Sequence, residues 1–124
     1  MSTIRSYRDL DAWKMAMRLA KECYRITNQF PRAEQFGLSQ QLRRAAVSVP
    51  SNLAEGNGSR RRQIYIHHVN IALGSLAELD TQLELAVEFG FVSRNDVVGA
   101  TDLVRQLSRL MLTLVRALET ARAS

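Results

Sequence analysis

Residues 41–62 read QLRRAAVSVPSNLAEGNGSRRR, and this stretch combines a helical pattern with residues that helices seldom contain. Leucine, alanine and valine recur every three or four positions from Leu38 to Leu53, which predicts an amphipathic helix. Pro50 lies inside the pattern, where it removes one backbone hydrogen bond. Because the apolar stripe continues in phase beyond Pro50, we expect a kinked helix that stops at Gly56-Asn57-Gly58.

Three more helices are expected around this one. Asp9, Ser59 and Ser93 each precede an apolar pattern of period three to four, so we expect each to cap a helix. Gly74 interrupts the longest pattern, and a close backbone approach by a neighbouring helix would explain a glycine there. The expected boundaries are Asp9 to about Asn28, ending before Phe30-Pro31; 34–36 to 55; Ser59 to Gly90; and Ser93 onward.

Four helices with short connections and no strand pattern predict an all-α, up-down-up-down four-helix bundle. We expect one domain over residues 1–124 with its core in residues 9–121, a size at which pairing with further copies adds useful burial. The apolar band of the last helix is too wide for a single neighbour, which indicates either central burial or a subunit interface.

Composition excludes several classes of protein. The apolar fraction is 46% and the charged fraction 23%, as in ordinary globular proteins. No apolar run is long enough to span a membrane, and residues 1–8 lack the apolar segment of a signal peptide, so a cytoplasmic location is expected. Cys23 has no second cysteine to pair with, and we interpret it as a small buried helix residue.

Most of the net charge of +5 lies in residues 41–62, which contain five arginines and one glutamate. Three of the arginines are expected in the first turn of the third helix, where free backbone N–H groups and guanidinium groups together favour a phosphate. Alternatively, Glu55 pairs with one of them and the rest are solvated. The candidate nucleic-acid-binding residues are Arg43, Arg44, Arg60, Arg61 and Arg62.

A second candidate is a polar junction between the second and third helices. Spacings of three, four and seven place its second-helix members on one face, and Ser75 and Glu78 lie one turn apart on the third helix. A hydrogen-bonded network of this kind more often fixes packing or assembly than performs catalysis, and Glu78 could pair with Arg43 or Arg44. The junction residues are Gln41, Ser48, Asn52, Glu55, Ser75 and Glu78.

No catalytic motif, metal site or cofactor site is predicted. His67 and His68 are adjacent and point about 100° apart on a helix, so they cannot bind one metal together, and we expect both to be solvated or interfacial. The sequence contains no phosphate-binding GKS or GKT motif and no nucleophile elbow. We therefore expect a protein that is not an enzyme.

The chain resembles the four-helix-bundle family encoded in intervening sequences of bacterial 23S rRNA genes. The resemblance covers residues 9–119 and rests on LDAWKMA (10–16), FPRAEQFGLSQQLRRAAVSVPSNLAEG (30–56), ALGSLAEL (72–79) and EFGFV (88–92). The family is similar in turn to the accessory variability determinant proteins of diversity-generating retroelements, which bind nucleic acid and a reverse transcriptase. The resemblance implies a homopentamer with a role in RNA or DNA binding.

Two hypotheses about function follow. In the first, a homo-oligomer, expected to be a pentamer, binds RNA or DNA phosphates through its arginines. In the second, the chain is an adaptor or assembly scaffold for a protein partner, and the arginines make subunit contacts. Neither hypothesis involves a membrane.

Overall fold

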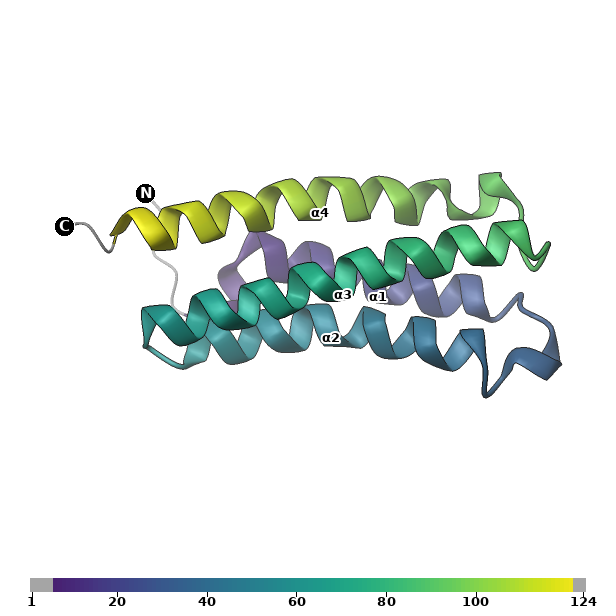
Figure 1. The fold of residues 1–124 in the computed structure, drawn as a ribbon, viewed down its shortest axis with the longest axis horizontal. Helices are drawn as coiled ribbons and strands as arrows, with labels where there is room; N and C mark the ends of the chain where they lie inside the picture. Colours follow the sequence, from purple (N-terminus) through teal and green to yellow (C-terminus); the bar gives the residue numbers. More distant parts are fainter. Residues whose placement is uncertain (1–5, 122–124) are drawn as a thin grey trace.

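A computed structural model describes residues 6–121, and within this range the chain forms helices and no strand (Figure 1). The predicted domain also covers residues 1–5 and 122–124, which lie outside the described part. The all-α class is confirmed. The elements are η1 (Tyr7–Asp9), α1 (Asp11–Thr27), η2 (Arg32–Glu34), α2 (Leu38–Gly58), α3 (Arg62–Glu88) and α4 (Arg94–Ala121).

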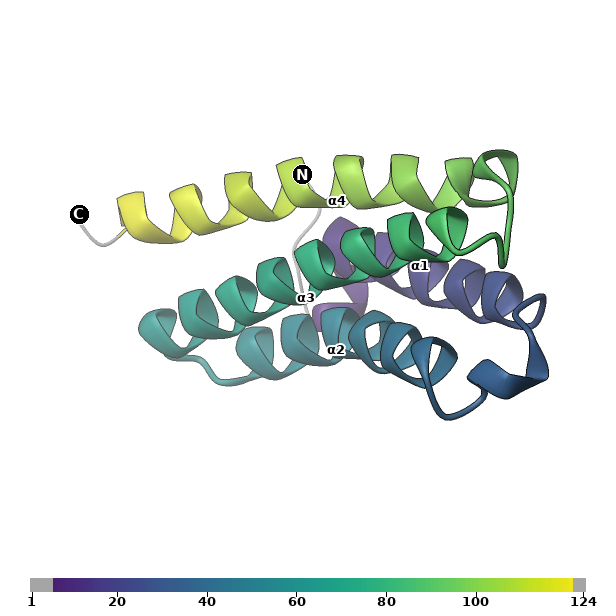
Figure 2. The same ribbon diagram turned by 45° about the vertical axis from the view of Figure 1, so that its right-hand side comes forward.

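The four long helices pack side by side in the order α1, α2, α3, α4, and α4 returns to contact α1. The most extensive contact joins α2 to α3 (Figures 1 and 2). Both views place η2 and the beginning of α2 at one end of the bundle and the α2–α3 connection at the other. In the described part of the chain, no helix is sufficiently long and apolar to cross a bilayer.

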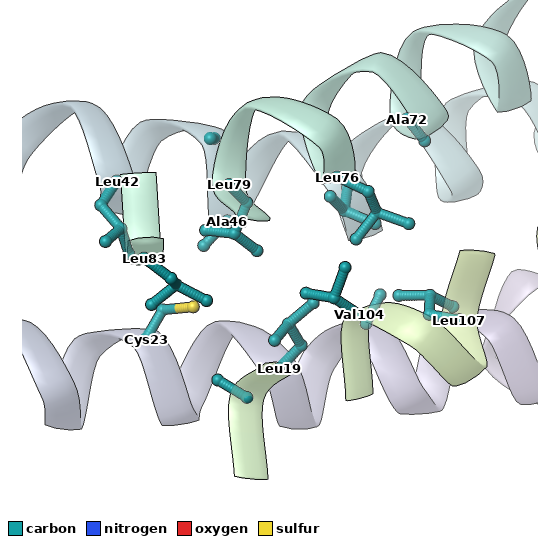
Figure 3. Close-up of a cluster of buried hydrophobic side chains, with 14 of the residues drawn as sticks. Leu19, Cys23, Leu42, Ala46, Ala72, Leu76, Leu79, Leu83, Val104 and Leu107 are labelled. Carbon is teal, nitrogen blue, oxygen red and sulfur yellow. The ribbon is translucent and has the colours of Figure 1, made fainter. Parts of the chain in front are cut away.

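The core runs along the centre of the bundle and receives side chains from all four helices (Figure 3). Leu19 of α1, Leu42 of α2 and Leu107 of α4 are almost completely buried, and burial of one such side chain stabilises the fold by about 1.5–3 kcal/mol. Cys23 is buried among them, as predicted, and burial raises the pKa of its thiol to about 12.

The beginnings of the first two helices differ from the predicted ones. Asp9 belongs to η1 and is not the cap of α1, because Leu10 occupies the N-cap position and makes no side-chain cap bond. The break at Phe30-Pro31 is confirmed, but η2 takes up the residues after it, and α2 begins only at Leu38. The backbone N–H of Leu38 donates to the Glu34 carboxylate at 3.1 Å, which stabilises this later beginning of α2.

Helix α2 continues past Pro50, as the phase of its apolar stripe predicts, and reaches Gly58. The helix therefore ends at the last residue of the predicted stop Gly56-Asn57-Gly58, later than the expected boundary at 55. A Cβ atom on Gly56 would lie 2.8 Å from the Cβ of His68, so this glycine makes room for α3 instead of ending α2. Gly74 was expected to provide such an approach, but it faces open space, with no atom within 4 Å of an added Cβ.

The connection between α2 and α3 also differs from the predicted one. Ser59 is the C-cap of α2, and its hydroxyl donates to the Gly56 carbonyl at 2.8 Å and accepts from the Arg61 N–H at 3.3 Å. Helix α3 begins at Arg62, with Arg61 as its N-cap. The serine therefore ends α2, and on the other side it bonds to the N-cap residue Arg61, outside the helical residues of α3.

The connection between α3 and α4 agrees with its prediction. Gly90 has φ of 76°, a backbone conformation that glycine adopts at little cost, and it follows the last residues of α3. The Asp96 N–H donates to the Ser93 hydroxyl at 3.2 Å, and the Ser93 N–H donates to the Asp96 carboxylate at 2.9 Å. These reciprocal bonds form a capping box for α4. Arg94 and Glu84 then join α4 to α3 through two bonds of 2.7 Å.

Candidate functional site

A chain of hydrogen bonds links α2 to α3 on the face where the polar junction is predicted. The hydroxyl groups of Ser48 and Ser75 lie 2.8 Å apart and bond across the two helices. The Asn52 amide donates to the Ser48 carbonyl at 2.8 Å and to the Ser48 hydroxyl at 3.0 Å. The structure therefore brings these three predicted residues together, and all of them are half-buried.

His68 completes this chain, although it was expected to be solvated or interfacial. Its Nδ1 lies 2.9 Å from the side-chain Oδ1 of Asn52, and its Nε2 lies 3.1 Å from the Glu55 carboxylate. Both ring nitrogens thus contact oxygen atoms of α2 side chains. The side chain of His68 is 15% exposed, whereas that of Glu55 is 72% exposed, so the network opens to solvent at Glu55.

A signal for His68 is present in the sequence. His68 precedes Ser75 by two helical turns, so the two residues share one face of α3. A second missed contact lies nearby, where the Asn57 amide donates to the Tyr65 hydroxyl at 3.2 Å.

Two predicted members lie outside the network. Gln41 is exposed at the beginning of α2, and its backbone N–H donates to the Gly37 carbonyl. Glu78 is exposed on α3 and accepts a long bond of 3.5 Å from Gln82. Within residues 6–121, Glu78 forms no ion pair with Arg43 or Arg44, so the predicted bridge is not formed.

Arg43 is held by α1. Its Nε donates to the Thr27 hydroxyl at 2.7 Å, and its Nη2 donates to the Asn28 side chain at 2.9 Å. Its guanidinium also lies over the Tyr24 ring, 4.4 Å from the centroid. Arg43 therefore joins α1 to α2 and keeps a fixed positive charge at the surface, whereas its neighbour Arg44 is exposed.

The other three arginines lie at the opposite end of α2, where the prediction for the first turn of α3 is only partly correct. Arg60 and Arg61 are exposed residues of the connection, and only Arg62 is helical. Among the described residues other than glycine, Arg60 alone has a positive φ, of 65°. Arg62 is half-buried, and its Nε is buried without a hydrogen-bond partner in the described part of the chain.

Glu55 does not pair with any of these arginines, because its carboxylate contacts His68. The alternative prediction, in which Glu55 neutralises one arginine of the connection, is therefore wrong. The ion pairs within residues 6–121 are made by Arg25, Arg94, Arg105 and His68. None of the five candidate arginines has a carboxylate partner in that range.

The five arginines form two separate groups. The helical stretch from Arg44 to Gly58 rises about 21 Å at about 1.5 Å per residue. Figures 1 and 2 show the beginning of α2 and the α2–α3 connection at opposite ends of the bundle. The chain therefore presents two basic ends, with the polar network of His68 on α2 and α3 between them.

The described residues include no cluster of three or more histidine, cysteine, aspartate or glutamate side chains that could hold a metal ion. The network between α2 and α3 contains one imidazole and one carboxylate, which contact each other at 3.1 Å. Its remaining members are neutral hydroxyl and amide groups. The arrangement can fix the register of α2 against α3. Guanidinium groups without a carboxylate partner within residues 6–121 lie at the two basic ends.

Comparison with known proteins agrees with this architecture. A solved structure from Bacteroides thetaiotaomicron, described as a protein of unknown function from the S23 ribosomal protein family, superimposes with a TM-score of 0.78. The two sequences are 19% identical, and the match covers 85% of this chain and 95% of the other, so the likeness shows the fold. No curated protein matches the sequence significantly.

The sequence itself carries the family assignment. The profile of the 23S rRNA-intervening sequence proteins matches residues 8–113, which include α1, α2, α3 and most of α4. The matched range also contains both basic ends and the whole polar network between α2 and α3. The chain therefore belongs to the 23S rRNA-intervening sequence protein family.

Proposed function

We propose that this chain is a non-enzymatic, up-down-up-down bundle that assembles into a homo-oligomer, expected to be a pentamer, and binds RNA or DNA phosphates. The observation that carries the proposal is that Arg44, Arg60 and Arg61 are exposed and lack a carboxylate partner within residues 6–121. Unpaired guanidinium groups bind phosphate oxygens through charge-assisted hydrogen bonds. The resemblance to accessory variability determinant proteins is in line with this role and stays a prediction.

Assembly is supported by large apolar side chains at the surface of α4. Val98 is 52% exposed and Leu112 is 44% exposed, although α4 buries another full seam against its neighbours. Covering such side chains with a further copy removes apolar area from water, which is the main driving force for association. The wide apolar band of α4 is thus partly a core seam and partly a candidate subunit contact.

The test combines light scattering with nucleic-acid binding at increasing salt. We expect a single oligomer whose affinity for RNA or DNA falls steeply with salt, because phosphate contacts release counterions. Reversing Arg44, or Arg60 with Arg61, to glutamate should weaken binding while the oligomer persists. Arg62 is left unchanged because it is half-buried. Reversal of the exposed α4 residues Arg109 and Arg116 is the matched control.

A protein adaptor or assembly scaffold is the second candidate function. The exposed Phe89 supports it, since 59% of this residue faces solvent at the end of the bundle where α3 meets α4. In that case, reversal of Arg44, Arg60 and Arg61 would dissociate the oligomer. Binding that is unchanged between low and high salt would also contradict the phosphate mechanism.

A further inference from the structure

Three adjoining grooves cover the face formed by the second half of α1, η2 and the first half of α2. Arg43 lines the first and second grooves, Tyr24 lines the second and third, and Asn28 lines the first and third. Because they share these residues, the three form one continuous surface, which we call the α1–α2 groove. It lies at the end of the bundle that carries Arg44.

The α1–α2 groove is strongly basic. No aspartate or glutamate is among the residues that line it. Glu22 pairs with one of the lining cations, Arg25, and Glu34 accepts from the Leu38 N–H. The groove therefore fits a polyanion. The cations that line it are Lys21, Arg25, Arg32, Arg43 and Arg44.

Large apolar side chains lie among these cations in the wall of the groove. Phe36 is 81% exposed and stands beside Arg44 and Val47 in the second groove. The ring contacts of the described residues involve other aromatic side chains, and none of them includes Phe36. Most of the phenyl ring is thus exposed to an incoming flat group. Cations around a free aromatic face are typical of surfaces that bind nucleobases.

The cations around Phe36 differ in their freedom. Arg43 is fixed by Thr27 and Asn28 and covers one face of the Tyr24 ring, so this part of the groove is preformed. Arg44 is exposed and makes no ion pair within residues 6–121. A ligand would therefore meet an ordered cation beside the aromatic rings and a free guanidinium next to them, which suits a base together with its phosphate.

We propose that the α1–α2 groove binds single-stranded nucleic acid, with a base stacked on Phe36 and adjacent phosphates held by Arg44 and the other cations of the groove. In a duplex the base faces are already stacked on each other, so a free phenyl ring gains no contact from them. In a single strand those faces are accessible. This inference rests on the nucleic-acid binding proposed above and adds a preference for single strands to it.

The test compares Phe36→Ala with the wild-type protein by fluorescence polarisation. The probes are a labelled single strand of about 12 nucleotides and a duplex of about 12 base pairs, close to the known site sizes for single-strand binding. We expect Phe36→Ala to weaken single-strand binding by about fivefold to a hundredfold and to change duplex binding by less than about twofold. Phe36→Trp should retain single-strand affinity. Phe89→Ala, which removes an exposed ring outside the groove, should change neither affinity.

The two proposals fail in distinguishable ways. If the wild-type protein binds neither probe, nucleic-acid binding itself is wrong, and the preference for single strands falls with it. If both probes bind and Phe36→Ala leaves single-strand affinity unchanged, only the stacking inference is overturned. The inference is also overturned if Phe36→Ala reduces the mass measured by light scattering, because the groove would then be covered by a second copy of the chain.

Discussion

Gly56 lies where α3 comes so close to α2 that no side chain fits between them. An added Cβ would stand 2.8 Å from the Cβ of His68 and 3.1 Å from the Tyr65 ring. The His68 Cβ sits directly on the backbone of its helix and cannot swing away like the end of a flexible side chain. This single position therefore sets how closely α2 and α3 pack, and with it the geometry of the bonds from His68 to Asn52 and Glu55.

Substitution of Gly56 by alanine should therefore destabilise the protein. We expect Gly56→Ala to lower the free energy of unfolding by about 1–3 kcal/mol, as overpacking in a well-packed interior does. Urea denaturation followed by circular dichroism measures the change. Gly74→Ala is the matched control, because Gly74 is helical and has open space around it, and alanine there should stabilise by about 0.5–1 kcal/mol. Equal effects at the two glycines would contradict this account.

At the scale of the helices, the two connections on either side of α3 are held by different means. Ser93 and Asp96 bond reciprocally and leave α4 with a local, self-contained beginning. Ser59 bonds back to Gly56, and α3 begins without a side-chain cap. The beginning of α4 therefore depends on its own sequence, whereas the beginning of α3 depends on its packing against α2.

Loss of the Ser93 hydroxyl should lower the free energy of unfolding by about 1 kcal/mol, the usual cost of removing an N-cap.

Bonds from Ser93 lower the pKa of Asp96, with the backbone N–H as the main cause. The stabilisation by Asp96 is therefore present above the pKa of the unfolded carboxyl and is lost as the pH falls through the lower, folded-state pKa. Asp96→Asn should remove this part of the acid dependence. Asp102→Asn, on an exposed carboxylate further along α4, is the control for urea denaturation at neutral and acidic pH.

The sequence predicts the presence of each helix and its apolar stripe more reliably than the residues at which the helix begins and ends. The apolar stripes of α1 to α4 are visible as regular spacing and Ser93 is a local cap signal, and both predictions are confirmed. The beginning of α3 is not predictable in this way, because Ser59 is a favoured N-cap residue, but its hydroxyl bonds back to the Gly56 carbonyl of α2. The choice between Gly56 and Gly74 as the close-packed glycine likewise depends on how the helices face each other.

The candidate site was predictable to a similar degree. The faces of α2 and α3 bring Ser48, Asn52 and Ser75 together, as helical spacing requires. Arg43 was expected to be a surface cation, but contacts with Thr27 and Asn28 from another helix give it a structural role. A contact between residues far apart in sequence leaves no local pattern.

At the scale of the whole molecule, two basic ends separated by the length of α2 should make duplex binding depend on duplex length. The helical distance of about 21 Å corresponds to about 6 base pairs at about 3.4 Å per step. A longer duplex can contact both ends at once, whereas a shorter one contacts either end alone. Simultaneous contact raises the apparent affinity, because the second contact becomes intramolecular.

Charge reversal at one end should therefore have different effects on long and short duplexes. For duplexes well above about 6 base pairs, Arg44→Glu should lower affinity more than tenfold, because the duplex can then no longer contact both ends at once. The loss is on the order of that caused by removing two phosphate contacts. For shorter duplexes the loss should be about twofold, because the end with Arg60 and Arg61 still binds. Fluorescence polarisation over a series of lengths measures the difference. The same loss at every length would mean that the two ends do not act on one duplex.

The burial of Cys23 has a practical consequence for the chemistry of the intact protein. It is the single thiol of the chain, it is fully buried, and its pKa of about 12 leaves almost no thiolate at neutral pH. Alkylating reagents and fluorescent maleimides should therefore find no target while the bundle is folded. A cysteine introduced at an exposed position such as Arg60 would carry a spectroscopic label at one defined place, without removal of the native thiol.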